Sequence, residues 1–90
     1  MALLFDKDAF TGIPAQDIQR LLTKIQWLWA NRRAITHESL AGNLVGFYKR
    51  RAGKYRIIYT YDDSPDELVI RLVGTRDEIY KEAPKRLATQ

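Results

Sequence analysis

The most regular apolar pattern in the chain runs over residues 15–33 (AQDIQRLLTKIQWLWANRR). Its apolar positions recur at the three- and four-residue spacing that lines one face of an α-helix. These positions are Ile18, Leu21, Leu22, Ile25, Leu28 and Trp29. Pro14 suits the first turn of a helix, and Asp17 lies where the helix dipole favours an acid. The pattern therefore predicts a long amphipathic helix.

Trp27 lies outside this apolar stripe. At about 100° per residue, it points to the opposite side of the helix. Two interpretations stay open. The short N-terminal segment covers the ring, or the ring is an exposed anchor for a protein partner, since aromatic side chains are enriched at interface hot spots.

Short apolar and β-branched runs predict four strands. The first is ALLF (residues 2–5), and the others cover residues 44–51, 54–62 and 67–74. Ala52-Gly53 suits a two-residue hairpin loop, and DDSPD at residues 62–66 is rich in turn formers. Residues 34–43 are predicted to form a connection with one helical turn over residues 36–42.

This order of elements predicts an α+β fold in a single domain over residues 1–90. We expect a small antiparallel sheet of about four strands. N-terminal helices pack on one of its faces, and a short C-terminal helix or tail follows the last strand.

The predicted hairpin carries more positive charge than a sheet needs to fold. Its cations are Lys49, Arg50, Arg51, Lys54 and Arg56. Because side chains alternate along a strand, all of these except Arg50 share the face away from the helices, if Ala52-Gly53 is the whole loop. Like charges directly opposite each other destabilise a sheet by roughly 0.2–1 kcal/mol per pair. The pattern favours a bound anion, and a solvated face whose charges pair with acids elsewhere is the alternative.

Composition narrows the choice of partner and compartment. A net charge of +4 and a pI near 9.6 favour an anionic partner. The chain has no cysteine, which excludes a disulfide scaffold and a thiolate zinc site and fits a reducing compartment. The apolar run at the N-terminus is too short for a signal peptide or a membrane span, so we expect a cytoplasmic protein that contacts no membrane.

Other candidate chemistry is sparse. His37, the single histidine, lies in a polar connection and is predicted to be a surface residue; acid–base chemistry is the alternative, because imidazole titrates near neutrality. The acidic run DDSPDE at residues 62–67 lacks the ligand spacing of a calcium loop. No metal or cofactor is expected.

Residues 40–83 resemble the RelE branch of the RelE/ParE toxins of bacterial toxin–antitoxin modules. The shared skeleton is a leucine, a glycine, G-x-x-K-x-R-x-G-x-Y-R-x-x-Y, an apolar strand and R-x-x-x-Y. In this chain its residues are Leu40, Gly42, Gly46, Lys49, Arg51, Gly53, Tyr55, Arg56, Tyr59, Arg76 and Tyr80. Residues 1–39 agree with that family only in outline.

The resemblance implies a metal-independent endoribonuclease that cuts mRNA in the A site of the small ribosomal subunit. The RNA 2′-hydroxyl attacks the adjacent phosphate, leaving a cyclic phosphate and a free 5′-hydroxyl. It also implies a cognate antitoxin that holds the toxin inactive, and through which alone the toxin meets DNA. Trp27, Arg76 and Tyr80 are the residues we expect the antitoxin to contact.

The resemblance also assigns roles to individual residues. Lys49 acts on the 2′-hydroxyl, and Arg56 stabilises the charge that develops on the phosphate. Arg76 is a second phosphate-binding arginine, and Tyr80 orients the substrate. Those four are the expected catalytic residues.

Three more residues are expected to bind RNA. Arg51 and Lys54 would contact the backbone. Phe47 stands where RNA-cleaving members carry a basic residue two positions before the lysine, and it could stack on a base instead. Two other functions stay open: a ParE-like inhibitor of DNA gyrase without catalysis, and a basic binding module or inactive toxin.

Overall fold

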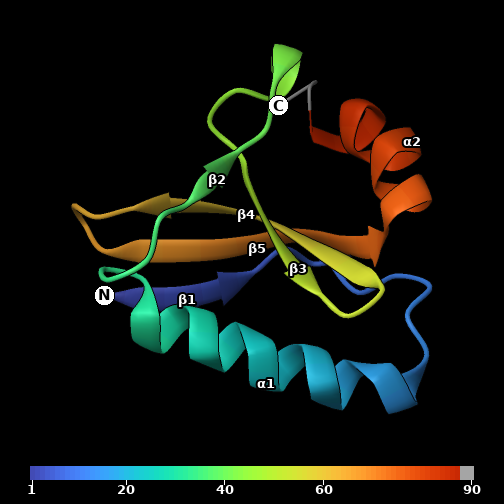
Figure 1. Cartoon of the computed structure of the whole chain (residues 1–90), viewed down its shortest axis with the longest axis horizontal. Coiled ribbons are helices and arrows are strands. Elements are labelled where there is room, and N and C mark those ends of the chain that lie inside the picture. The colour runs from blue at the N-terminus through green and yellow to red at the C-terminus, as the bar shows by residue number, and fades with distance from the viewer. Residues whose placement is uncertain (88–90) are drawn as a thin grey trace.

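Five strands form one mixed sheet in the order β1-β5-β4-β3-β2, with a helix on each face (Figure 1). The computed structural model describes residues 1–87, with Asn43 described by its backbone alone. The elements are β1 (Ala2–Phe5), α1 (Ala15–Asn31), β2 (Glu38–Ser39), the 3-10 turn η1 (Gly42–Leu44), β3 (Tyr48–Ala52), β4 (Tyr55–Asp62), β5 (Glu67–Thr75) and α2 (Arg76–Leu87). The α+β prediction is confirmed.

The sheet is larger than expected and not wholly antiparallel. β1 pairs with β5 in parallel, and β2 adds a two-residue edge beside β3. The three consecutive strands β3, β4 and β5 are antiparallel, as predicted. A bulge lies between β4 and β5, because Ile58 pairs with Leu72 whereas Tyr59 pairs with Ile70. It places both Arg71 and Leu72 on the same face of the sheet.

Helix α1 packs on one face of the sheet through the predicted apolar stripe. Leu21, Ile25 and Leu28 are buried there against Ile57 and Tyr59 of β4. The helix ends at Asn31, two residues earlier than predicted. The next two residues, Arg32 and Arg33, turn toward the β4–β5 loop instead (see below).

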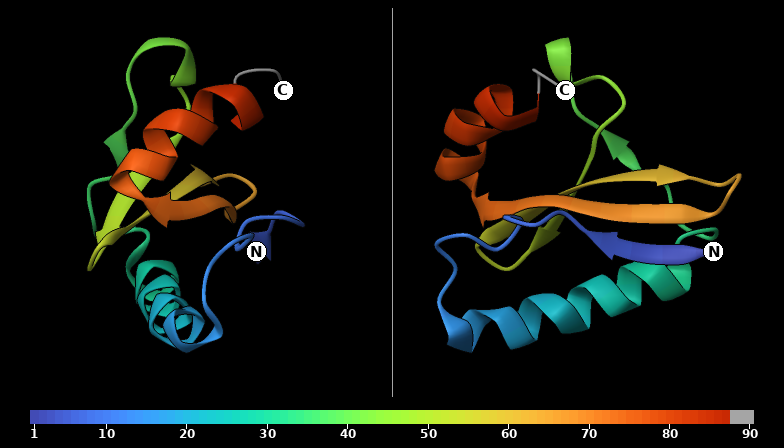
Figure 2. Two further views of the ribbon diagram at one scale, coloured as in Figure 1. Left: turned by 90° about the vertical axis from the view of Figure 1, so that its right-hand side faces the viewer. Right: turned by 180° about the vertical axis from the view of Figure 1, so that it is seen from behind.

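Helix α2 packs on the opposite face, as Figure 2 shows with α2 above the sheet and α1 below it. Ile79, Ala83 and Leu87 are buried there with Ile58 and Leu72. The sequence analysis predicted that helices cover only one face and that this face is exposed. That prediction is wrong for the part beneath α2. The reason is that β4 and β5 are apolar on both sides, and such strands need a cover on each face.

The β3–β4 hairpin turns one residue later than predicted. Ala52 pairs with Tyr55, so the two loop residues are Gly53 and Lys54. Gly53 has a φ of +61°, which a two-residue hairpin loop requires and which glycine adopts without a steric clash. The loop keeps its length, so each strand residue keeps its predicted face.

Residues 36–42 do not form the expected helical turn. Glu38 and Ser39 pair with Lys49 and Tyr48 to extend the sheet, and the helical turn η1 begins only at Gly42. This edge pairing depends on contact with β3, which local sequence does not encode. Within the described residues, neither α1 nor α2 is long and apolar enough to cross a membrane.

Candidate functional site

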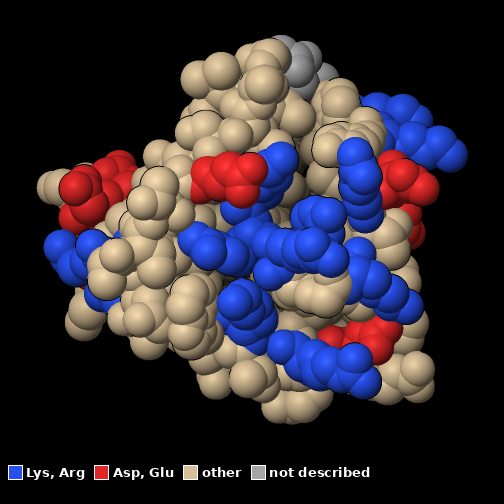
Figure 3. All heavy atoms as spheres, viewed as in Figure 1, with Lys and Arg blue, Asp and Glu red and all other residues tan. Residues whose placement is uncertain are grey.

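Three cations project from the β3–β4 hairpin onto the α2 side of the sheet. Arg51 lies opposite Arg56, and Lys49 lies opposite Ile58, whose side chain packs beneath α2. Tyr48 and Ala52 of β3 pack against the α1 core on the other face. Figure 3 shows a band of Lys and Arg side chains across this part of the molecule, in front of β3 and its hairpin.

Arg51 and Arg56 form a like-charge pair at the end of the hairpin. The Arg51 guanidinium donates a hydrogen bond to the Gly53 carbonyl oxygen over 3.3 Å, and that of Arg56 reaches the Tyr55 carbonyl over 3.5 Å. Among the ion pairs formed by residues 1–87, none joins either arginine to a carboxylate. The pair therefore presents to an incoming anion two guanidinium groups that no carboxylate of residues 1–87 neutralises.

Lys49 has an acidic neighbour on the edge strand. Its Nζ lies 3.5 Å from Glu38 Oε2, because Glu38 is its partner in the β2–β3 ladder. The Lys49 side chain is 33% exposed and that of Glu38 is 70% exposed. An exposed pair of this kind contributes little free energy, so an incoming anion can compete for the ammonium.

A capping box fixes where α2 begins. The Thr75 backbone N–H and hydroxyl donate to Glu78 Oε1 over 2.9 and 2.8 Å, and the Glu78 N–H reaches the Thr75 hydroxyl over 3.4 Å. The hydrogen bonds from Thr75 hold the pKa of Glu78 below its usual value. The sequence analysis overlooked this motif, although the pattern T-x-x-E before a helix predicts a capping box.

The capping box makes Arg76 the first residue of α2 and places Tyr80 one turn later. The Arg76 guanidinium carbon lies 5.6 Å from the centre of the Tyr80 ring, and Tyr80 is 58% exposed. Gly74, which precedes them, lies opposite Arg56 in the β4–β5 ladder. The start of α2 thus rises from the strand end beside the Arg51–Arg56 pair.

A groove of about 310 Å³ separates α2 from the β2–β3 edge and joins two of the expected catalytic residues. Lys49 lines one wall and Tyr80 the other, with Leu44 and Ile79 also lining it. The four expected catalytic residues thus meet along one side of the sheet: Lys49 and Tyr80 share a groove, Arg76 contacts Tyr80, and Arg56 lies by the base of α2.

Three residues expected to bind RNA or antitoxin occupy different environments. Phe47 is half-buried against the α2 core. Lys54 lies in the loop and faces α1, with Nζ 4.0 Å from Asp17 Oδ2 and 5.3 Å from the centre of the Tyr55 ring. Its predicted place among the cations of the α2 side is therefore wrong. Trp27 also lies on the α1 side and is 42% exposed, so the N-terminal segment does not cover it.

His37 is not the surface residue that the polar sequence around it suggested. It is half-buried, and its ring lies 5.1–5.6 Å from those of Tyr48, Tyr59 and Tyr61. Nε2 lies 2.8 Å from the Arg32 carbonyl oxygen and Nδ1 lies 2.6 Å from the Tyr59 hydroxyl. Because a carbonyl only accepts, Nε2 donates, and in the neutral ring Nδ1 accepts from Tyr59. These hydrogen bonds give His37 a structural role on the α1 side, where it joins the end of α1 to β4.

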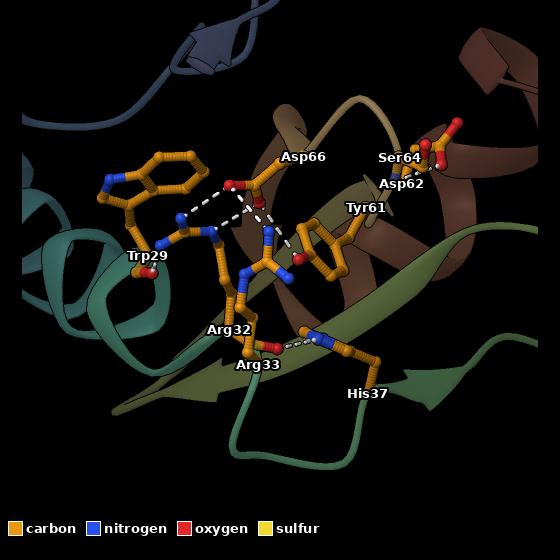
Figure 4. A network of polar contacts seen from close by, with 8 residues as sticks. All are labelled: Trp29, Arg32, Arg33, His37, Tyr61, Asp62, Ser64 and Asp66. Atoms are coloured by element: carbon orange, nitrogen blue, oxygen red, sulfur yellow. Dashed lines mark hydrogen bonds and ion pairs between the residues drawn. The ribbon is translucent and has the colours of Figure 1, made fainter. Parts of the chain in front are cut away.

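Asp66 is the main polar residue that the sequence analysis missed. It is buried in the β4–β5 turn with φ +66°, and Figure 4 shows Arg32, Arg33 and Tyr61 converging on it. Arg32 binds its two carboxylate oxygens over 2.7 and 2.8 Å, and Arg33 approaches to 3.1 Å. The hydrogen bonds from Arg32 hold the pKa of Asp66 well below its usual range. The cluster joins the end of α1 to the sheet, away from the site.

The sequence matches no protein-family model and no curated protein, whereas solved structures match most of its length. A mutant of the Escherichia coli toxin RelE in the free state is 27% identical, covers 94% of this chain and 95% of its own, and has a TM-score of 0.67. The toxin–antitoxin complex RelBE2 from Mycobacterium tuberculosis is 22% identical, with coverages of 83% and 96% and a TM-score of 0.61.

A YoeB/ParE toxin from Agrobacterium tumefaciens is 18% identical and covers 84% of this chain and 99% of its own, with a TM-score of 0.63. The chain therefore shares its fold with these toxins of the RelE/ParE superfamily. It is similar to the RelE type in particular, since the likeness to E. coli RelE extends over 94% of the chain at 26–27% identity.

Proposed function

We propose that this protein is a ribosome-dependent mRNA endoribonuclease that cleaves in the A site and is held inactive by a cognate antitoxin. The observation that supports it most directly is the Arg51–Arg56 pair, which has no carboxylate partner among residues 1–87 and lies on the same side as Lys49, Arg76 and Tyr80. Two adjacent guanidinium groups match the geometry of a phosphodiester, which they bind through paired hydrogen bonds.

The proposed reaction needs no metal and no cofactor. Lys49 accepts the proton of the 2′-hydroxyl, and the 2′-oxygen attacks the adjacent phosphorus. The bond from phosphorus to the 5′-oxygen breaks, and the departing oxygen takes a proton from water, so the products are a 2′,3′-cyclic phosphate and a 5′-hydroxyl. To act as the base, Lys49 must first release its proton and leave Glu38, whose exposed carboxylate turns readily into solvent.

The arginines act on charge and not on protons. A guanidinium stays protonated under all ordinary conditions, so Arg56 and Arg76 are suited to stabilising the pentacovalent phosphate and the departing oxygen. Tyr80, exposed above the groove, orients a base by stacking. Phe47 is half-buried against the α2 core, so only part of its ring is available to a base.

The antitoxin is proposed because several of the similar structures are toxins bound to an antitoxin or to a peptide of one. The similar structures include the RelBE2 complex, E. coli RelE bound to a peptide of the antitoxin RelB, and a RelB–RelE complex from Methanococcus jannaschii. Arg76 and Tyr80, at the exposed start of α2, are proposed contacts for such a partner, together with Trp27 on the α1 side.

The test is primer extension on a reporter mRNA in a reconstituted translation system. We expect discrete cuts in ribosome-occupied codons, with new 5′-hydroxyl ends, and their loss in Arg56→Ala/Arg76→Ala. Lys7→Ala, an exposed change in the β1–α1 connection, is the matched control and should cut like the wild type. An intact message with folded wild-type protein would refute the nuclease. Stalled gyrase–DNA complexes would then identify a gyrase inhibitor.

A further inference from the structure

A second concave surface lies on the side of the hairpin that faces α1. It is a cavity of about 690 Å³ between residues 17–27 of α1 and residues 52–55 of the β3–β4 hairpin, and we name it the α1–hairpin groove. Its apolar lining comes from Leu21 and Trp27 of α1 and from Ala52 and Tyr55 of the hairpin. None of the expected catalytic residues lines it.

The groove has an excess of positive charge. Arg20 and Lys24 of α1 and Lys54 of the loop line it, with Asp17 as the one acid among its lining residues. That acid is already engaged: the Tyr55 hydroxyl donates to Asp17 Oδ2 over 2.5 Å, and Lys54 Nζ lies 4.0 Å from the same oxygen. An occupant therefore meets an apolar floor and a cationic rim.

Trp27 identifies the class of occupant. Lys24 Nζ sits 4.1 Å from the centre of its ring, and the Arg50 guanidinium carbon lies at 5.7 Å. A nucleic-acid base would stack on a free ring face. Here Lys24 already takes one face by a cation–π contact. An inserted aliphatic or aromatic side chain, flanked by carboxylates that pair with the rim, fits these groups better.

We propose that the α1–hairpin groove docks an acidic amphipathic segment of the antitoxin, with an apolar side chain against Trp27 and Leu21 and carboxylates near Arg20, Lys24 and Lys54. The proposal rests on the antitoxin named in the proposed function and adds a second contact to it. Lys49, Arg51 and Arg56 project from the other face of the same hairpin. Docking in the groove therefore holds the antitoxin without occupying the cleavage site.

Because the groove lies on the other face from the cleavage site, its residues contribute to antitoxin affinity and not to cleavage. Substitutions in the groove weaken the complex and leave cleavage by the free toxin intact. The charge complementarity also makes the complex depend on salt, since the rim cations are exposed or half-buried.

The test is calorimetric titration of the full chain with the full-length antitoxin, alongside the primer-extension assay. We expect Trp27→Ala to weaken binding by about tenfold or more, as for an interface hot spot. Lys24→Glu should weaken it severalfold, with a smaller salt dependence than the wild type. Lys7→Glu is the matched charge reversal and should bind like the wild type. All three should cut mRNA like the wild type, and thermal melting verifies that each is folded.

Several results would overturn the proposal. Unchanged antitoxin affinity in both Trp27→Ala and Lys24→Glu would show that the antitoxin docks elsewhere. Unchanged affinity with lost mRNA cutting would assign the groove to RNA. If the wild type cuts mRNA but binds no antitoxin, the partner is wrong while the nuclease stands. If it binds antitoxin through the groove but cuts nothing, the nuclease is wrong while the groove stands.

Discussion

Arg51 and Arg56 lie directly opposite each other in the β3–β4 ladder, next to the two-residue loop. Sheets avoid like charges at such positions because the pair costs roughly 0.2–1 kcal/mol. Neither arginine forms an ion pair with a carboxylate among the described residues. The hairpin thus keeps an unfavourable pair, as expected of a site selected to bind an anion and not to maximise stability.

The first prediction concerns this conflict between stability and binding. Arg51→Thr should raise the free energy of unfolding by roughly 0.2–1 kcal/mol, because it removes the repulsion and places a good strand former on β3. It should also weaken binding to single-stranded RNA. Urea denaturation and fluorescence anisotropy measure the two effects. Arg51→Lys keeps the charge and should stay near the wild type in stability; a fall in stability with threonine would contradict the repulsion.

A second prediction concerns Asp66, which ties the end of α1 to the β4–β5 turn. Asp66→Asn keeps a residue that tolerates the positive φ and removes only the charge, leaving Arg32 and Arg33 unpaired. We expect the melting temperature to fall by several degrees at neutral pH.

The pH dependence of that loss has a definite sign. The pKa of Asp66 is lowered by folding, so its stabilisation is complete above the unfolded value, near pH 4, and is lost as the pH falls through the folded one. The gap in melting temperature between wild type and Asp66→Asn should therefore shrink as the pH is lowered from about 5 to 2. A constant gap would mean that the asparagine disturbs the turn itself.

A third prediction concerns the bond between Tyr55 and Asp17. Donation to the carboxylate raises the pKa of Tyr55 to about 12. The unfolded chain loses this proton near pH 10, so the bond stabilises the fold below about pH 10 and its contribution disappears between about pH 10 and 12. Tyr55→Phe should remove that part of the pH dependence. It should also remove a late component from the ultraviolet titration of tyrosine ionisation.

Two other tyrosines set the control for that titration. Burial raises the pKa of Tyr59 and of Tyr61 as well. Tyr61→Phe should therefore remove a different late component and leave the Tyr55 component in place. Identical titration curves for wild type and Tyr55→Phe would contradict the assignment.

The fourth prediction concerns the capping box at the start of α2. Glu78→Ala removes the acceptor of the Thr75 N–H and hydroxyl and should cost about 1 kcal/mol, typical of a lost helix cap. Because Arg76 and Tyr80 lie in the first turns of this helix, mRNA cutting should fall more than the lost stability explains.

Glu78→Gln is the matched variant, since glutamine also completes a capping box. It should retain most of the stability and activity that alanine loses. Circular dichroism, urea denaturation and primer extension measure these effects. Equal losses in both variants would show that the Glu78 charge matters and not the cap.

Much of the fold could be predicted from the sequence. The three- and four-residue spacing of Leu21, Ile25 and Leu28 determined which side of α1 is buried, because a helix fixes the direction of each side chain. Alternation along β3 and β4 likewise determined that Lys49, Arg51 and Arg56 share a face. The loop slid by one residue without changing its length, and a slide of that kind preserves the faces.

Tertiary structure alone decided the rest, because those features depend on contacts between distant segments. The parallel pairing of β1 with β5 and the edge formed by Glu38 leave no local pattern. Two-sided apolar strands indicate a second cover, but not that α2 supplies it. The polar sequence around His37 suggested exposure, yet Arg32, just past the end of α1, and Tyr59 of β4 hold it half-buried. Periodicity fixes which way a side chain points; only packing fixes what it meets.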